Sequence, residues 1–427
     1  MSAVIVVGGG LAGLLTAYRL TQAGHSVVVR EAAPRWGGMI APVEVAGMLV
    51  DSGAEAYATR GGHGRALCDE LGLEVAAPEG TPHVWWSKRA WPMADGLLGI
   101  PGDLDDPALG VLTDAERTRF AADLTMDPAI GREALTIGDL ARIRLGEGAL
   151  QKLVEPVATG IYATGAEHLP LAAVAPGIHE AIQAEGSLIA AVASQKAHRG
   201  SAVEQPVGGM FRLIETLVDR VEDLGADIRA AAPITHLRRS GHGLAAHTHD
   251  GENLVAERIV LATTAAVSEH LLRDLGVVFV APPVNKARQA ILALDNTALR
   301  EHPVGSGVLV ASRGEVRAKA LTHYSAKWPW ARESGLEVVR VSYPEHVFPT
   351  RQEILADASR LTGVAVTDSQ VKGLSSVGWD AMPTRIEAAN RDYLVEAAAG
   401  VGVDLVGAWL DGNGVASVIA GTRRVVS

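Results

Sequence analysis

The chain begins with a run of apolar, β-branched residues, Val4 to Val7, followed by three glycines and then by a segment rich in alanine and leucine. A short apolar run that ends at glycine is typical of a buried strand, and the segment after it is typical of a helix. A second apolar run, Ser26 to Arg30, predicts another strand. The N-terminus is therefore predicted to form a strand, a tight turn, a helix and a second strand.

Two later stretches of the chain carry patterns that fit the same kind of domain. Leu213, Leu217 and Val221, with Ile214 and Val218 between them, recur at the three- and four-residue spacing of an amphipathic helix. Three further elements are predicted from their patterns: a hairpin over 237–250, a buried strand over 257–263 and a helix of small residues over 416–424.

The segments between these stretches differ in composition and in hydrophobic pattern. Together with the N-terminal pattern they predict an α/β fold with two further domains. Residues 112–200 look mostly helical, with helix starts near Asp114 and Thr136. Residues 80–110 and 280–380 contain predicted strands together with prolines and tryptophans. We predict a Rossmann-like nucleotide-binding domain from 1–60, 205–270 and 385–427, a mixed-sheet substrate domain from 80–110 and 280–380, and a helical domain from 112–200.

The glycines after the first strand have the Gly-x-Gly-x-x-Gly spacing of dinucleotide sites. Gly8 allows the tight turn, Gly10 lets the backbone approach a pyrophosphate, and Gly13 lets the helix pack closely on the strand. The helix N-terminus then faces the phosphates with its partial positive charge. An acid at the end of the second strand can accept hydrogen bonds from a ribose diol. The predicted cofactor-binding residues here are Gly8, Gly10, Leu11, Ala12, Gly13 and Glu31.

A second glycine pair follows soon after the ribose acid, in the segment Arg35-Trp-Gly37-Gly38-Met39. It predicts another close approach of backbone to cofactor and a larger cofactor than NAD. The segment resembles the Arg-x-Gly-Gly of flavoproteins of the amine oxidase type. The resemblance implies FAD, with Arg35, Gly37, Gly38 and Met39 in the site.

Composition narrows the class of protein. The 427 residues are 48% hydrophobic and 20% charged, with a formal net charge of −11. An acidic chain without a basic stripe is not expected to bind nucleic acid. Its one cysteine, Cys68, allows no internal disulfide and suits a reducing compartment. No signal peptide and no apolar run near the roughly 20 residues of a membrane span is evident, so we expect a cytoplasmic protein, with peripheral membrane contact left open.

Four stretches give a more specific resemblance, to the bacterial coproporphyrinogen and protoporphyrinogen oxidases of the FAD amine oxidase superfamily. They are Asp51-Ser-Gly-Ala-Glu-Ala56, Gly160-Ile-Tyr-Ala163 with Leu169 and Pro176, the Lys-Trp-Pro strand at Lys327-Trp328-Pro329, and the C-terminal loop Gly412-Asn-Gly-Val415. The Lys-Trp-Pro match is the most discriminating and favours the coproporphyrinogen-type enzymes of Gram-positive bacteria and actinobacteria. Such enzymes oxidise a porphyrinogen with FAD and dioxygen in haem biosynthesis and release hydrogen peroxide.

The resemblance also implies roles for particular residues. The C-terminal loop would direct a helix N-terminus at the flavin pyrophosphate or at the flavin N1 and O2 edge, unless it is an ordinary Asn-Gly turn. Lys327 is the leading candidate for a charge near flavin N5; the alternative is a solvated lysine on a strand edge. The remaining predicted cofactor-binding residues are Ile234, Thr263, Trp409, Asn413, Gly414 and Val415.

Substrate binding requires cations, because porphyrinogen propionates are carboxylates. Lys88, Arg89 and Arg313 are candidate clamps, with solvated surface as the alternative for each. Trp85, Trp86 and Trp91 form either an apolar wall for a flat macrocycle or part of the core. The histidines around residues 242–249 have no third ligand at metal-site spacing, so no metal is expected.

Departures from the family pattern leave alternatives open. Thr164 precedes Gly165 in the signature, the segment from Leu169 to Pro176 differs, and Ala41 stands where a threonine is usual. Another amine oxidase or desaturase activity on the same scaffold, and a flavin-binding homologue without turnover, therefore remain alternatives. The resemblance further allows a ferrochelatase as a product-accepting partner; the oligomeric state is not predicted.

Overall fold

The computed structural model describes residues 3–162, 164–196, 202–241, 243–311, 314 and 316–426, with the backbone alone at 161, 162 and 196. Arg313, a predicted substrate clamp, and Ala163 and His242 lie outside the described residues. The chain forms two compact units. The first contains Met1–Ala77, Ser201–Ala287 and Gly378–Ser427, and the second contains Pro78–Gly200 and Arg288–Val377. A further division of unit 2 into a sheet domain and a helical domain stays a prediction.

A parallel sheet forms the centre of unit 1, and each of the three stretches of the chain contributes strands to it. Among the described residues its order is β10 (Asp227–Arg229), β2 (Ser26–Arg30), β1 (Ala3–Val7), β14 (Arg258–Leu261) and β20 (Val403–Leu405). Neighbouring strands pair in parallel throughout. The two N-terminal apolar runs therefore pair directly with each other at the middle of the sheet.

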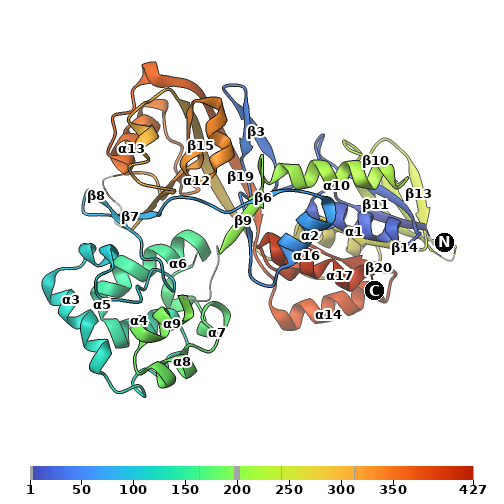
Figure 1. The fold of residues 1–427 in the computed structure, drawn as a ribbon. Helices are drawn as coiled ribbons and strands as arrows, with labels where there is room; N and C mark the ends of the chain where they lie inside the picture. Colours follow the sequence, from blue (N-terminus) through green and yellow to red (C-terminus); the bar gives the residue numbers. More distant parts are fainter. Residues whose placement is uncertain are drawn as a thin grey trace. The chain divides into compact units, whose positions relative to one another are not determined.

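Both faces of this sheet are covered, as a parallel sheet requires. Val4 and Val6 of β1 pack with helices α1 (Leu11–Gln22) and α10 (Phe211–Asp223), which lie side by side in Figure 1. Ile5 and Val7 point to the other face and pack with a second layer. That layer contains the antiparallel strands β11 (Ile234–Ser240), β12 (Gly243–Thr248) and β13 (Asn253–Ala256) and the helices α11 (Ala265–Arg273) and α14 (Ala388–Ala399).

Short elements complete unit 1. The short strands are β3 (Pro42–Val45) paired with β4 (Met48–Asp51), and the small sheet β5 (Tyr57–Ala58), β9 (Val203–Pro206) and β6 (Val75–Ala76). The short helices are α2 (His63–Leu71), α15 (Ala408–Asp411), α16 (Val415–Gly421) and α17 (Arg423–Val426). Of these, α2, α16 and α17 add apolar side chains to the core on the α1 side of the sheet.

A mixed sheet forms one part of unit 2. In the described part of the chain its order is β19 (Val371–Pro383), β15 (Val284–Leu294), β18 (Glu337–Tyr343), β17 (Ala320–His323), β16 (Gly307–Val310), β7 (His83–Trp86) and β8 (Arg89–Pro92). Helix α13 (Arg351–Thr362) packs on one face through Ile354 and Leu361, against Leu292, Val339 and Val341. The predicted strand at 307–310 is β16.

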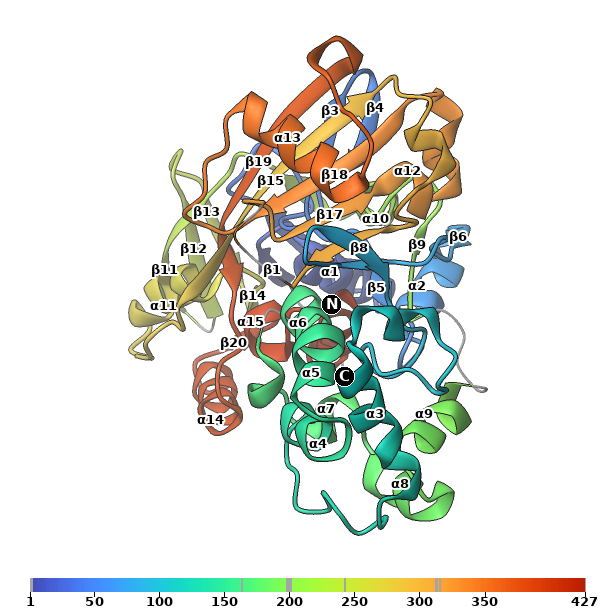
Figure 2. The same ribbon diagram turned by 90° about the vertical axis from the view of Figure 1, so that its left-hand side faces the viewer.

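The other part of unit 2 is helical, as predicted, and Figure 2 shows its helices grouped together. Their buried apolar side chains form one cluster. Thr113 and Thr136 cap the first two helices, which confirms both predicted helix starts. The α-helices are α3 (Asp114–Ala121), α4 (Ile137–Leu145), α5 (Glu147–Ala149), α6 (Glu155–Tyr162), α7 (Leu171–Val174), α8 (Ile178–Glu185) and α9 (Leu188–Lys196). A π-turn, η3 (Leu150–Val154), joins α5 to α6, and the 3₁₀ turns of unit 2 are η1 (Pro107–Val111), η2 (Ala122–Thr125), η4 (Ala166–His168), η5 (Leu299–Glu301), η6 (Pro329–Ser334) and η7 (Asp368–Gln370).

A buried ion pair joins three elements of this helical part. Arg144 and Asp123 are both fully buried, and the guanidinium Nε donates to the carboxylate. Arg144 also donates to the carbonyl of Ile130 at 2.9 Å, while the carboxylate accepts the Ile189 N–H at 2.9 Å. The pair therefore ties η2 and α4 to the start of α9.

The prediction of a strand through Lys327-Trp328-Pro329 is wrong. The segment forms a helical turn, α12 (Tyr324–Lys327), followed directly by η6. Pro329 cannot donate to a strand ladder, whereas it suits the first position of a helical turn, which it occupies in η6.

Candidate functional site

Two of the glycines after β1, Gly8 and Gly13, cannot be replaced by another residue without a shift of the backbone. Gly8 has a φ of 109°, and a Cβ there would lie 2.5 Å from the carbonyl oxygen of Ala262. A Cβ on Gly13 would lie 1.9 Å from the carbonyl oxygen of Gly8, so α1 packs directly on the turn. Gly10 is the N-cap of α1, and no side chain caps the helix. Leu11 and Ala12 are buried in the first turn.

Glu31 directly follows β2 and is held by backbone donors. Its carboxylate accepts the N–H of Gly9, and it accepts the N–H of Ala33 at 2.7 Å. A Cβ on Gly9 would lie 2.3 Å from the ring of Trp36, so this part of the turn is filled. Glu31 thus stands beside the glycine turn, as a ribose-binding acid would.

The second glycine pair lies against the first. Gly37 forms an isolated parallel bridge with Gly10 and donates to the carbonyl of Gly9 at 2.8 Å. The Gly38 Cα lies 3.9 Å from where a Cβ of Gly10 would be. Arg35 donates to the Gly38 carbonyl at 2.9 Å, which fixes the end of the loop. Two backbone segments without side chains therefore face the uncapped start of α1.

This arrangement fits FAD. The first N–H groups of a helix have no partner within it, and α1 leaves them without a side-chain cap. The space beside Gly10 is open, because a Cβ there would meet only one atom within 4 Å, and that at 3.9 Å. Uncapped donors, a positive helix end and backbone without side chains are what a pyrophosphate requires.

The sequence did not indicate Trp379, which lies next to the second glycine loop. Trp379 lies in the last part of β19, which from Gly378 onward belongs to unit 1, and it donates its indole N–H to the Ser52 carbonyl at 2.7 Å. A Cβ on Gly53 would lie 1.9 Å from the Met39 carbonyl oxygen and 3.1 Å from the Trp379 ring. The guanidinium of Arg35 lies 5.6 Å from the same ring. Trp379 is thus a half-buried aromatic surface at the end of the second glycine loop, and no local pattern signals it.

The sequence indicated Asp51 only as part of a family motif and did not predict which groups its carboxylate contacts. Its fully buried carboxylate accepts the N–H groups of Met210 at 3.0 Å and Phe211 at 3.2 Å. A carboxylate at a helix N-terminus is stabilised by the helix dipole. Asp51 therefore joins the first stretch of unit 1 to the start of α10.

The C-terminal loop at Gly412–Val415 directly follows the helical turn α15. Trp409 lies in this turn and is 2% exposed; its indole N–H donates to the Thr263 carbonyl at 3.1 Å, and its ring stacks on Phe279. Packing within unit 1 therefore explains why Trp409 is buried. Asn413 and Gly414 are exposed, and Val415 begins α16, which no side chain caps.

Two predicted cofactor residues lie elsewhere in unit 1. Ile234 is buried at the start of β11. Thr263 follows β14, and its hydroxyl lies 2.8 Å from the hydroxyl of Ser268. A role in FAD binding stays a prediction for both.

The predicted substrate cations Lys88 and Arg89 are at the tip of the β7–β8 hairpin in unit 2. Ser87 and Lys88 both have positive φ, and the exposed Arg89 lies 4.2 Å from the Trp91 ring. Trp85 packs in the core under α13, whereas Trp86 and Trp91 pack on the helical core. The three tryptophans thus do not form one wall.

Lys327 is the last residue of α12. Its carbonyl accepts the N–H of Glu79 at 2.8 Å, and its ammonium group lies 5.2 Å from the Trp328 ring. Trp328 itself is fully buried. The lysine therefore stands at the end of a helical turn rather than on a strand edge.

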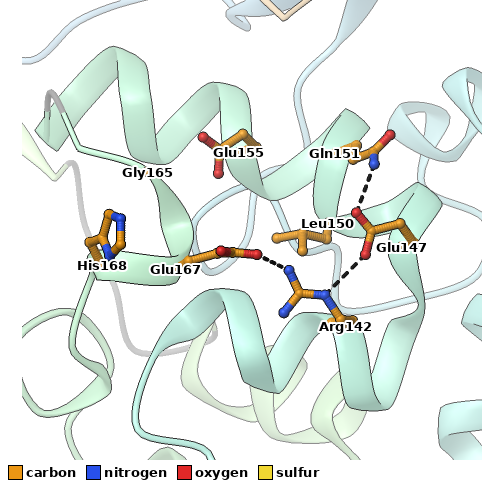
Figure 3. Close-up of a pocket in the computed structure, with 8 residues that line it drawn as sticks. All are labelled: Arg142, Glu147, Leu150, Gln151, Glu155, Gly165, Glu167 and His168. Carbon is orange, nitrogen blue, oxygen red and sulfur yellow. Dashed lines mark hydrogen bonds and ion pairs between the residues drawn. The ribbon is translucent and has the colours of Figure 1, made fainter.

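A cavity of about 330 Å³ lies among the helices of unit 2 (Figure 3). Its polar groups already pair: Arg142 donates to Glu147 at 3.0 Å and to Glu167, and the Glu155 carboxylate accepts the Ala166 N–H. Three carboxylates line it, which disfavours an anionic ligand. We do not assign the substrate to this cavity.

Two features are absent from the part of the chain that the structure describes. No group of three or more His, Cys, Asp and Glu side chains is placed to hold a metal ion. None of the described helices is long and apolar enough to cross a membrane.

Comparison with known proteins gives the family. Residues 11–301 match the family of flavin-containing amine oxidoreductases. Coproporphyrinogen III oxidase of Mycobacterium leprae is 30% identical over 99% of this chain and 96% of its own length. Protoporphyrinogen oxidase 1 of Arabidopsis thaliana chloroplasts is 25% identical over 81% of this chain and 66% of its own length. A crystal structure from Exiguobacterium sp. 255-15, provisionally assigned as a protoporphyrinogen oxidase, superposes with a TM-score of 0.83 at 22% identity and covers 100% of this chain and 98% of that one.

These matches confirm the resemblance and the FAD-binding α/β fold that the sequence predicted. The chain belongs to the flavin-containing amine oxidoreductase family, and its cofactor is FAD.

Proposed function

We propose that the protein oxidises coproporphyrinogen III to coproporphyrin III in haem biosynthesis, with FAD as cofactor and dioxygen as the final electron acceptor. The observation that carries the proposal is the match over nearly the full length of both chains to a relative named coproporphyrinogen III oxidase. The glycine-lined site of unit 1, which fits FAD, supports it.

The overall reaction removes six hydrogens from the macrocycle and reduces three molecules of dioxygen to three of hydrogen peroxide. Bound FAD supplies hydride acceptance from a macrocycle carbon and electron transfer to dioxygen. The protein has to hold the cofactor, orient the substrate and keep water out.

In unit 1, three groups of residues hold the cofactor. The uncapped start of α1 would bind the pyrophosphate, and the Glu31 carboxylate would accept hydrogen bonds from the ribose hydroxyls. The loop Gly37–Gly38 lets the cofactor lie along the backbone, and Trp379 borders its far end. The uncapped α16 N-terminus at Gly414 and Val415 binds the pyrophosphate or the N1 and O2 edge of the flavin ring.

In unit 2, cations orient the substrate. The chain carries a net charge of −11, so binding of propionates depends on local positive groups. Lys88 and Arg89 at the β7–β8 tip have this role, and Arg89 is exposed. For Lys327 we keep the role that the resemblance implies, a positive charge that would favour electron transfer from reduced flavin to dioxygen.

One experiment tests the function and the choice of substrate. The purified protein, loaded with FAD, is mixed in air with either coproporphyrinogen III or protoporphyrinogen IX, and porphyrin fluorescence and peroxide are followed. We expect faster porphyrin formation from coproporphyrinogen III, with one peroxide for each pair of hydrogens removed. A preference for protoporphyrinogen IX, the second candidate substrate, would agree with the chloroplast relative. Turnover of amines alone, or no turnover, would contradict the proposal.

The other partners stay predictions. Contact with a membrane surface and transfer of product to a ferrochelatase can be tested by vesicle co-sedimentation and by pull-down with a purified ferrochelatase.

A further inference from the structure

Glu31, the acid proposed to hold the adenosine ribose, lies where three segments of unit 1 meet. Its backbone N–H donates to the Arg229 carbonyl in β10 at 3.0 Å, and its own carbonyl accepts the Ala232 N–H at 2.8 Å. Its carboxylate accepts the N–H of Gly9 in the glycine turn and the N–H of Ala33. The direction of the carboxylate therefore depends on how the end of β2 is held against β10 and against the glycine turn.

The residue before Glu31 is a buried arginine. Only 2% of the Arg30 side chain is exposed. Its Nε and Nη2 donate to the two carboxylate oxygens of Glu252 at 3.0 and 2.9 Å, and Nη2 also donates to the Asp227 carboxylate at 2.8 Å. Its Nη1 donates to the carbonyls of Val29 at 3.1 Å and Asp227 at 3.2 Å. The five N–H groups of the guanidinium thus have five acceptors within unit 1.

These contacts join the end of β2 to two other elements. Asp227 is the first residue of β10, which pairs in parallel with β2. Glu252 lies in the turn between β12 and β13, and the Thr248 hydroxyl oxygen accepts its N–H at 2.8 Å. A guanidinium that binds a carboxylate through two N–H groups fixes direction as well as distance, which a flexible ammonium group does not. Arg30 therefore fixes the end of β2, directly before Glu31, relative to both elements.

We propose that Arg30 is a positioning residue for Glu31. By fixing the end of β2, it sets the direction in which the Glu31 carboxylate meets the ribose hydroxyls in the adenosine half of FAD. The inference rests on the ribose-binding role proposed for Glu31. A hydrogen bond weakens steeply as its angle departs from linear, so a carboxylate that turns away loses much of its contribution to binding. Arg30 itself is buried and acts only through Glu31.

The test compares two cofactors that differ only in the ribose 2′-hydroxyl of the adenosine half. Apoprotein is titrated with FAD and with the analogue that contains 2′-deoxyadenosine, and quenching of flavin fluorescence gives each Kd. We expect wild type to bind the analogue about tenfold more weakly, which is the lower end of what a hydrogen bond to a charged group contributes. Arg30→Met should raise the Kd for FAD about fivefold and the Kd for the analogue less than about twofold. The ratio of the two Kd values should therefore fall from about ten to between about two and four.

Two further variants complete the test. Arg30→Lys keeps the charge but not the planar fork, so its Kd ratio should lie between those of wild type and Arg30→Met; it is the second variant if Arg30→Met does not fold. Arg229→Met is the matched control, because Arg229 lies directly opposite Arg30 in the β2–β10 ladder and pairs with Asp250 at 2.7 Å, but its side chain is 51% exposed. The substitution keeps the backbone carbonyl that Glu31 contacts. We expect it to leave both Kd values unchanged.

A Kd ratio that stays at about ten in Arg30→Met, even if both Kd values rise, would overturn the inference, because the arginine would then only stabilise the fold. Equal Kd values for the two cofactors in wild type would overturn the ribose-binding role of Glu31 together with the inference. Neither result concerns porphyrinogen oxidation, because the titrations contain no porphyrinogen and the turnover assay tests that proposal separately.

Discussion

Gly10→Ala should weaken FAD binding while leaving the fold almost unchanged. Gly10 has a φ of −76°, which alanine adopts freely, and the new Cβ would meet only the Gly38 Cα, at 3.9 Å. The exchange of an N-cap glycine for alanine should cost less than about 1 kcal/mol of stability. The added methyl group enters the space that the pyrophosphate needs to reach the start of α1.

The size of the binding effect follows from overpacking. Forcing one methyl group into an occupied space costs about 1–3 kcal/mol. Since about 1.4 kcal/mol is a factor of ten in affinity, the Kd for FAD should rise about 5- to 150-fold. Titration of apoprotein with FAD, followed by quenching of flavin fluorescence, measures the Kd, and thermal unfolding of the apoprotein measures the stability.

Gly400→Ala is the matched control for this prediction. Gly400 is also in unit 1 and has a φ of −60°, and a Cβ there would come no closer than 3.5 Å to any atom. We expect an unchanged Kd. An unchanged Kd for Gly10→Ala itself would refute the placement of the pyrophosphate at this turn.

Three further predictions concern stability. Gly13→Ala should destabilise the apoprotein by about 1–3 kcal/mol, because its Cβ would lie 1.9 Å from the Gly8 carbonyl oxygen; an apoprotein midpoint in urea equal to wild type would contradict this. Arg144→Met should cost about 3–5 kcal/mol, seen as a lower urea midpoint, because it leaves the Asp123 carboxylate buried without its cation. Burial alone would raise the pKa of Glu337, but hydrogen bonds from a histidine ring and a serine hydroxyl outweigh it and hold the pKa below its usual range. The resulting stabilisation is present above the unfolded-state pKa of about 4.3 and is lost as the pH falls through the lower native pKa. The difference in free energy of unfolding between wild type and Glu337→Gln should therefore shrink from pH 6 to pH 3. A difference that stays constant over this range would contradict the prediction.

Local constraints made part of this molecule predictable. The roles of Gly8 and Gly13 follow from positive φ and from close packing against the next element, and both leave a fixed spacing in the sequence. The helix starts at Thr113 and Thr136 follow from caps that act within four residues. Such features need no knowledge of distant parts of the chain.

Contacts between distant segments could not be predicted in the same way. Trp379 reaches Ser52 across more than three hundred residues, and the carboxylate of Asp51 caps a helix that begins at Phe211. Neither contact produces a repeating pattern of residues in the sequence. The family resemblance predicted a strand at Lys327. The helical turn found there accepts hydrogen bonds from Arg332 and from the Glu79 N–H, and no local pattern indicates these contacts.

We propose that the protein's own FAD takes hydride from a porphyrinogen, and an anaerobic single turnover measures this step. The FAD-loaded protein is mixed with coproporphyrinogen III in the absence of oxygen, and the visible flavin band is followed by stopped flow. We predict that the band bleaches at a rate that rises with substrate concentration and returns when air is admitted. A band that stays unchanged with excess substrate would contradict the account.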